Sequence, residues 1–318
     1  MKSQGLFYKS ISQNKVKIVL GSSLNAIPKP WLYFDVPAVM VNALEIRGDP
    51  RVVLQYEGEL WIDSGGYQIL KKGLSVDLEK IAEIYRRVDA QLYLSLDVPP
   101  SPQDPPDVAE KKFEKSYSNW EKLRKMVGDS VIPVLHVYKD VGLFRRYLAR
   151  YLDAPALAIG AAVPYVLITK GAPRGSRELA LKLIAEVRAQ YKGPIHILGM
   201  GSPSVTPILA VMRIDSTDSA TWRLKAAYGK VVLPGGGERH VTSRSVNFGR
   251  AKPKYGELEE LYNFLQATGF PALDDFYSRI KTSFEYRALV NAWVVLKSWA
   301  EPPRPKSFKT LYQLAVSH

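Results

Sequence analysis

The chain has 318 residues, of which 46% are hydrophobic, and it carries a formal net charge of +13. That is enough apolar material for one large domain or two medium ones, and the ordinary charged fraction argues against a disordered protein. The chain contains no cysteine, which excludes disulfide bonds, a thiolate nucleophile and cysteine-ligated zinc. The basic excess favours a polyanionic partner such as nucleic acid over a surface that is basic for other reasons.

No apolar stretch approaches the roughly 18 uncharged residues that a membrane span needs. The run Val16–Leu20 is too short, and too close to Lys15 and Lys17, for the core of a signal peptide. We therefore expect a soluble, cytoplasmic protein. The four histidines are His136, His196, His240 and His318. No two of them are spaced i, i+4 as in zinc-protease helices, so we expect no metal site.

Short apolar runs alternate with longer amphipathic stretches along most of the chain. The predicted strands are Ala38–Val41, Leu60–Ile62, Leu92–Leu96, Ile132–His136, Ala156–Gly160, Ile195–Leu198 and Arg213–Asp215. The predicted helices between them are Val76–Val88, Pro106–Met126, Leu143–Leu152, Ser176–Gln190 and Ser204–Met212. This alternation predicts parallel βαβ units, and their number favours a TIM-like (β/α)8 barrel of the α/β class. An open doubly wound sheet is the alternative, but it usually has a glycine-rich phosphate loop near its N-terminus, which the sequence lacks.

The pattern changes after about residue 250. Lys252-Pro253-Lys254 interrupts the chain, and Glu257–Ala267 and Leu273–Ser298 have helical patterns before a proline-rich linker over residues 301–306. We predict a barrel over residues 1–250 and a helical C-terminal extension, residues 251–318, packed on it.

Polar residues or glycines end or directly follow most of the predicted strands. They are Asp63, Asp97, His136, Gly160, Gly199 and the segment Asp215-Ser216-Thr217-Asp218. In a parallel barrel these positions converge on the C-terminal face, where active sites form. A single aspartate at such a place is more often a helix cap. Three carboxylates with glycines at successive strand ends favour a functional site instead.

One of these segments carries a specific resemblance. Asp63-Ser64-Gly65-Gly66-Tyr67-Gln68 resembles the DSGG(F/Y)Q signature of the tRNA-guanine transglycosylase superfamily. Leu96-Asp97-Val98-Pro99-Pro100 is similar to the family's base-reading segment, and Gly199-Met200-Gly201-Ser202-Pro203 to its G-x-G-[TS]-P turn. Asp218 lies fifteen residues after Pro203, where the family places its nucleophilic aspartate. The resemblance covers roughly residues 35 to 245.

The chain also departs from the usual family pattern. The family's zinc site of three cysteines and a histidine cannot exist here. His136 stands in place of the usual glutamine of the fourth strand, and residues 159–164 replace the usual glycine-rich base-recognition loop. These departures resemble the zinc-free, DpdA-like branch of 7-deazaguanine DNA transglycosylases, which insert a 7-deazaguanine into DNA.

The resemblance implies roles for three aspartates in a double displacement at the sugar, similar to retaining glycoside hydrolysis. Asp218 is the candidate nucleophile, and Asp215 is the alternative. Asp63 is the candidate acid/base that protonates the departing purine and deprotonates the incoming one. Asp97 is suited to accept both N1–H and the exocyclic amine of guanine.

Further residues are candidates for contacts with the substrate. Those predicted to contact or surround the base are Ser64, Gly65, Gly66, Tyr67, Gln68, His136, Gly160, Ala161 and Met200. The two adjacent glycines would let the backbone approach a flat base closely. His136 is equally compatible with a buried, satisfied core histidine. The candidates for backbone phosphate contacts are Arg223, Lys225, Arg239 and Arg244.

Residues and resemblance together predict a base-exchanging transglycosylase that replaces guanine in a nucleic acid by a 7-deazaguanine. DNA is the favoured substrate, the free 7-deazaguanine base is the co-substrate, and no cofactor is expected. One alternative is the same exchange on tRNA. A second is a nucleoside hydrolase, in which water replaces the incoming base. A third, of another class, is a non-catalytic paralogue that binds a base or a nucleic acid.

Overall fold

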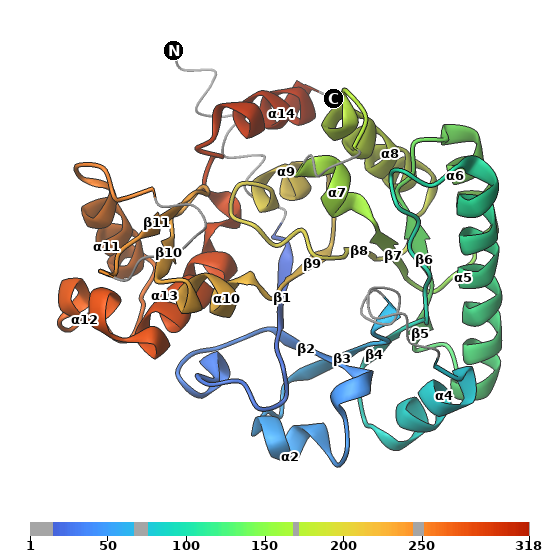
Figure 1. The fold of residues 1–318 in the computed structure, drawn as a ribbon, viewed down its shortest axis with the longest axis horizontal. Helices are drawn as coiled ribbons and strands as arrows, with labels where there is room; N and C mark the ends of the chain where they lie inside the picture. The colour runs from blue at the N-terminus through green and yellow to red at the C-terminus, as the bar shows by residue number, and fades with distance from the viewer. Residues whose placement is uncertain (1–14, 67–75, 168–171, 244–250, 318) are drawn as a thin grey trace.

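The computed structural model describes residues 15–66, 76–167, 172–243 and 251–317. Within these ranges nine strands form one parallel sheet that curls into a barrel, in the order β5-β4-β3-β2-β1-β9-β8-β7-β6 (Figure 1). The strands are β1 (Lys17–Gly21), β2 (Ala38–Asn42), β3 (Glu59–Asp63), β4 (Leu92–Leu94), β5 (Val131–Ile132), β6 (Val134–His136), β7 (Leu157–Gly160), β8 (Ile195–Ile197) and β9 (Ser216–Ser219). The prediction of a TIM-like barrel is confirmed.

The two end strands of this order are one segment of chain interrupted by Pro133. Proline has no N–H to give to a ladder, so a strand breaks at that residue. β5 pairs with β4, and β6 pairs with β7 on the other side. The Pro133 carbonyl still accepts from the Ala158 amide at 3.0 Å. β5 and β6 therefore fill one strand position and close the ring at eight positions.

Helices surround the barrel on its outside (Figure 1). They are α2 (Pro50–Leu54), α4 (Leu78–Arg87), α5 (Pro106–Val127), α6 (Val141–Arg150), α7 (Ala162–Val166), α8 (Ser176–Gln190), α9 (Thr206–Val211) and α10 (Thr221–Ala227). Aspartates begin three of them. The side chain of Asp49 accepts from the Arg51 amide, that of Asp77 from the Glu79 amide and that of Asp140 from the Leu143 amide. No helix in the described ranges is both long and apolar enough to cross a bilayer.

Two layers of apolar side chains hold the barrel together. The inner layer takes side chains from successive strands, among them Val19, Met40, Trp61, Leu94 and Ala158. The outer layer packs the other face of the strands against the helices. Because side chains alternate along a strand, the residue two positions after an inner residue also points inward, one layer nearer the C-terminal end.

Two strands differ from the prediction. The run containing Val16–Leu20, considered only as a possible signal segment, forms β1 and lies between β2 and β9. The predicted strand Arg213–Asp215 is wrong, because Arg213 has a left-handed backbone (φ 57) and the strand begins at Ser216. β9 is polar in sequence, so its burial between two neighbouring strands is not visible in an apolar pattern.

The C-terminal part is helical, as predicted, with differences in detail. It contains α11 (Glu257–Ala267), α12 (Phe276–Thr282), α13 (Phe284–Lys297) and α14 (Lys306–Ser317). The single predicted helix over 273–298 is two helices, because Ser283 is extended and caps α13 through the Tyr286 amide. The hairpin of β10 (Lys230–Val232) and β11 (Glu238–His240) was not predicted. Its residues Val231 to Leu233 share a second core with α11, α12 and α13. The boundary at residue 250 stays a prediction.

Candidate active site

Asp63 is the last residue of β3 and lies two positions after the inner residue Trp61, so its carboxylate points into the mouth of the barrel. Burial raises its pKa, and the nearby charges of Asp97 and Asp218 raise it in the same direction, so that together they bring it from 3.8 to about 7. The amides of Gly65 and Ser64 donate to the carboxylate and act in the opposite direction. A carboxyl group that gains and loses its proton near neutral pH is suited to act as both acid and base.

Two glycines bring the chain after β3 close to the neighbouring strand ends. Gly65 has φ +80, and a methyl group there would lie 2.7 Å from Asn42 Oδ1. Gly66 lies so close to Asp97 that a methyl group would be 2.5 Å from Oδ1 and closer still to the carbonyl oxygen. Gly65 therefore lets the Asp63 segment lie close to Asn42, and Gly66 lets it lie close to Asp97.

Asp97 follows β4 and is oriented by a histidine from β6. His136 Nε2 lies 2.8 Å from Asp97 Oδ2, and the imidazole is fully buried against the edge of Phe113. Its Nδ1 has no hydrogen-bond partner among the described residues. This favours the tautomer in which Nε2–H donates to the Asp97 carboxylate. Gly160 lies beside the ring, where a methyl group would be 3.1 Å from His136 Cδ2.

Asp218 lies within β9 and is fixed through one carboxylate oxygen. Its Oδ1 accepts from the Gly199 amide at 2.6 Å and lies 3.3 Å from His196 Nε2. Gly199 has φ +71, and the Gly201 amide donates to the Asp218 carbonyl at 2.9 Å. Oδ2 receives no hydrogen bond from any residue that the structure describes. One oxygen is thus anchored and the other is available for attack.

His196 was not predicted as a site residue. It lies in β8 with its ring centroid 4.8 Å from that of Trp61, in an edge-to-face arrangement, and its Nδ1 is 2.9 Å from Ser216 Oγ. A Ser216–His196–Asp218 chain of hydrogen bonds results. The sequence did contain a signal for it. His196 lies between the apolar residues Ile195 and Ile197, and because side chains alternate along a strand, its side chain must point to the opposite face from theirs.

Asp215 lies elsewhere. Its carboxylate accepts from the Ile195 amide at the start of β8 and pairs with Arg188 at 3.1 Å. It precedes β9, whereas Asp218 is the third residue of that strand. Three residues of extended chain span roughly 10 Å. Asp215 is therefore at the opposite end of the barrel from the Asp63 carboxylate.

Other predicted base contacts are buried or fall outside the described residues. Ser64 is fully buried and donates to the Ser95 carbonyl at 3.1 Å, so it holds two strand ends together. Met200 is 2% exposed and packs in the main core. Ala161 has φ 55 and precedes α7 beside Gly160. Tyr67 and Gln68 lie outside the described residues, and their roles stay predictions.

The predicted phosphate contacts are engaged in other interactions. Lys225 pairs with Glu238, and Arg239 makes two hydrogen bonds to Glu257. Arg223 donates to the Ile27 carbonyl and lies over the Phe284 ring. Arg244 is outside the described residues. A role in phosphate binding stays a prediction for each of the four.

Comparison with known proteins gives distant relatives. The chain matches no family model. It is 27% identical over 251 residues to "Uncharacterized protein 306" of Sulfolobus islandicus rod-shaped virus 1, a match covering 76% of this chain and 72% of the viral one. It is 27% identical over 217 residues to the tRNA-guanine(15) transglycosylase of Thermococcus onnurineus, covering 66% of this chain and 36% of that enzyme.

The tRNA-guanine(15) transglycosylase of Pyrobaculum aerophilum is 28% identical over 195 residues, which are 58% of this chain and 38% of that enzyme. The chain thus aligns with little more than a third of these archaeal enzymes, and with most of the viral protein. It is distantly homologous to archaeal tRNA-guanine(15) transglycosylases.

Proposed function

We propose that this chain exchanges guanine in a nucleic acid for a 7-deazaguanine base through a covalent aspartyl intermediate. The observation that carries the proposal is the meeting of three carboxylates at the C-terminal mouth of the barrel, close enough that Asp97 and Asp218 both raise the pKa of Asp63. A scaffold has no need to hold three like charges together, and repulsion of this kind is typical of catalytic sites.

The chemistry divides into two balanced steps. In the first, Asp218 Oδ2 forms a bond to C1′, the bond from C1′ to the purine nitrogen breaks with its electron pair on the base, and Asp63 gives that base a proton. In the second, the ionised Asp63 takes the proton from the corresponding nitrogen of the incoming base. That nitrogen then attacks C1′ and frees the Asp218 carboxylate. The anchoring of Oδ1 by the Gly199 amide supports the assignment, because it fixes the direction of attack.

Asp63 needs opposite protonation states in the two steps. Its pKa of about 7 means that both states are well populated at neutral pH. After the first step the Asp218 charge is gone, which removes one of the two charges that raise the pKa. Asp63 is then more readily ionised, as the second step requires.

Asp97 is proposed to read the base. His136 occupies one side of Oδ2, and Oδ1 together with the remaining lone pair of Oδ2 can accept two parallel N–H bonds from guanine. The close approach of Gly66 shapes the wall beside Asp97. A 7-deazaguanine presents the same N1–H and amine edge, so one carboxylate serves both the departing and the incoming base.

We propose DNA as the favoured nucleic acid, because the chain lacks the cysteines of the usual zinc site and has His136 in place of the usual glutamine. The names of the archaeal relatives point to tRNA instead. The experiment offers radiolabelled guanine, or 7-cyano-7-deazaguanine, with DNA and with tRNA separately. Label entering DNA supports the proposal. Label entering tRNA alone would refute the choice of DNA, and release of free guanine without incorporation would favour hydrolysis.

A further inference from the structure

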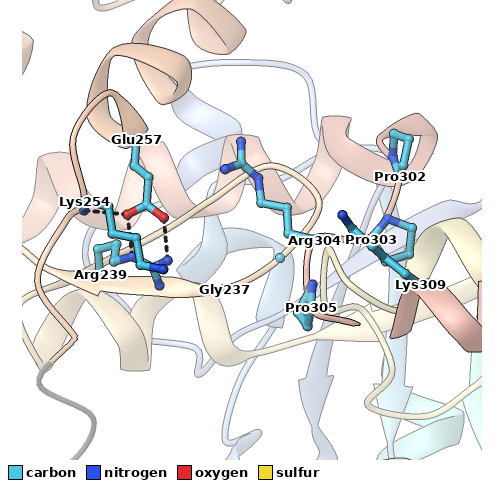
Figure 2. Close-up of a pocket in the computed structure, with 10 residues that line it drawn as sticks. Gly237, Arg239, Lys254, Glu257, Pro302, Pro303, Arg304, Pro305 and Lys309 are labelled. Atoms are coloured by element: carbon cyan, nitrogen blue, oxygen red, sulfur yellow. Dashed lines mark hydrogen bonds and ion pairs between the residues drawn. The ribbon is translucent and has the colours of Figure 1, made fainter. Parts of the chain in front are cut away.

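A hollow lies where the β10–β11 hairpin meets the segment that leads into α14 (Figure 2). Its volume is about 440 Å³. Arg239, Lys254 and Glu257 lie on one side of Gly237, and Arg304 and Lys309 lie on the other. Four cationic side chains thus surround the hollow together with one carboxylate, which gives it a clear excess of positive charge.

The walls of the hollow are fixed by main-chain contacts. The Arg304 amide donates to the Gly235 carbonyl at 2.7 Å, and Arg304 Nε donates to the Pro234 carbonyl at 2.5 Å. Gly236 and Gly237 have φ of +100 and +92, which lets the hairpin turn pass close by without side chains. Pro302, Pro303 and Pro305 stiffen the opposite wall.

The charges of the four cations are not equally available. Glu257 accepts two hydrogen bonds from Arg239, and Glu260 pairs with Arg304 at 2.7 Å. Lys254 and Lys309 are exposed, and the side chain of neither forms an ion pair with any residue that the structure describes. These two ammonium groups are therefore free to bind an anion, and the paired arginines hold the surrounding segments in place.

The hollow is connected to the proposed nucleophile by one short loop. Gly236 packs against Ser204, where a methyl group would lie 2.5 Å from its Cβ. Gly201, which is three residues before Ser204, donates its amide hydrogen to the carbonyl of Asp218. Three residues span at most about 10 Å, the axial rise of about three nucleotides in one strand of a duplex. A strand whose target nucleotide sits at Asp218 can thus place a neighbouring phosphate in the hollow.

We propose that this hollow binds backbone phosphate of the nucleic-acid strand flanking the target nucleotide, with Lys254 and Lys309 as its phosphate ligands. The inference rests on the proposed function for the orientation of the strand. A phosphate contact carries no sequence information, so the hollow positions the strand and the base pocket selects guanine.

The test is nucleic-acid binding by the full chain, measured by fluorescence anisotropy on a guanine-containing single-stranded DNA and on a tRNA transcript across a salt series. For Lys254→Ala combined with Lys309→Ala we expect roughly 10-fold weaker binding and, on the single-stranded DNA, a salt slope smaller by about 1.4, near 0.7 for each lost phosphate contact. Lys115→Ala combined with Lys122→Ala, on α5 across the barrel, is the matched control. Replacing Lys254 and Lys309 by arginine should restore binding.

An affinity and salt slope unchanged from the control would overturn the inference. So would loss of inorganic triphosphate binding with nucleic-acid binding intact, since the hollow would then hold a free phosphate compound. The readout does not need base exchange. A protein that binds through the hollow but exchanges no base retains this inference and loses the proposed function. If instead the protein exchanges base and the Lys254 and Lys309 variant binds nucleic acid normally, the proposed function is retained and this inference is lost.

Discussion

Substitution of Gly66 by alanine tests the geometry of the site with one methyl group. Gly66 does not have a positive φ, so alanine adds no backbone strain, and the effect comes from the methyl group alone. That methyl would lie 2.5 Å from Asp97 Oδ1, whereas ordinary contact begins at 3.4 Å. The Asp97 carbonyl oxygen would lie closer still, so Asp97 or the Gly66 backbone must move by about 1 Å to restore ordinary contact.

A displacement of this size at a reacting geometry costs on the order of 10²-fold in rate. We expect Gly66→Ala to lower kcat/KM for guanine exchange by about that factor, and to lower the free energy of unfolding by about 1 to 3 kcal/mol through overpacking. The assay is incorporation of labelled guanine, with urea unfolding in parallel. Gly48→Ala is the matched control, because a methyl group there has nothing within 4 Å. A folded Gly66→Ala protein with exchange within threefold of the control would refute the reasoning.

Three further substitutions test individual side chains. Because the pKa of Asp63 is raised from 3.8 to about 7, ionisation of this carboxyl group favours the unfolded state, and the free energy of unfolding falls as the pH rises from about 4 to about 7. Asp63→Asn should therefore raise Tm at pH 8. A gain in Tm of equal size at pH 4 would contradict this. His196→Ala should lower kcat about 10- to 100-fold with KM for the base little changed. His196→Gln should recover part of the lost kcat, because its amide can donate to Asp218. Equal losses of kcat in the two variants would argue against a positioning role. Asp215→Ala should leave exchange unchanged and cost about 1 kcal/mol in urea unfolding through the lost Ile195 amide contact, and a large loss of exchange would restore it as the candidate nucleophile.

The barrel could be predicted because its strands are short apolar runs spaced by amphipathic helices. Where the run is polar the prediction failed, as in β9, whose Ser216 and Thr217 are buried by the neighbouring strands. The break at Ser283 was missed because the apolar pattern continues across it, and only the capping contact with Tyr286 ends one helix and begins the next.

The site could be predicted in outline because strand ends of a parallel barrel converge. That rule predicted that Asp63, Asp97 and Asp218 lie near one another, and in the structure the charges of Asp97 and Asp218 both act on Asp63. It could not identify His196, which lies inside a strand and contacts the Asp218 carboxylate. It also could not show that the Ser64 hydroxyl donates to the Ser95 carbonyl, since that hydrogen bond joins residues far apart in sequence.

Charge along the chain was a weaker guide than strand position. Arg239 was predicted to contact phosphate, but it is bonded to Glu257, eighteen residues away. The free cations of the same hollow, Lys254 and Lys309, come from segments that only the tertiary fold brings to the hairpin.

The most direct test of the account is to trap the covalent intermediate. The protein is incubated with nucleic acid in the absence of an incoming base, quenched, digested and mapped by mass spectrometry. We predict a sugar ester on Asp218, absent in Asp218→Asn and still formed in Asp215→Asn. An adduct that persists in Asp218→Asn, or that maps to Asp215, would contradict the account.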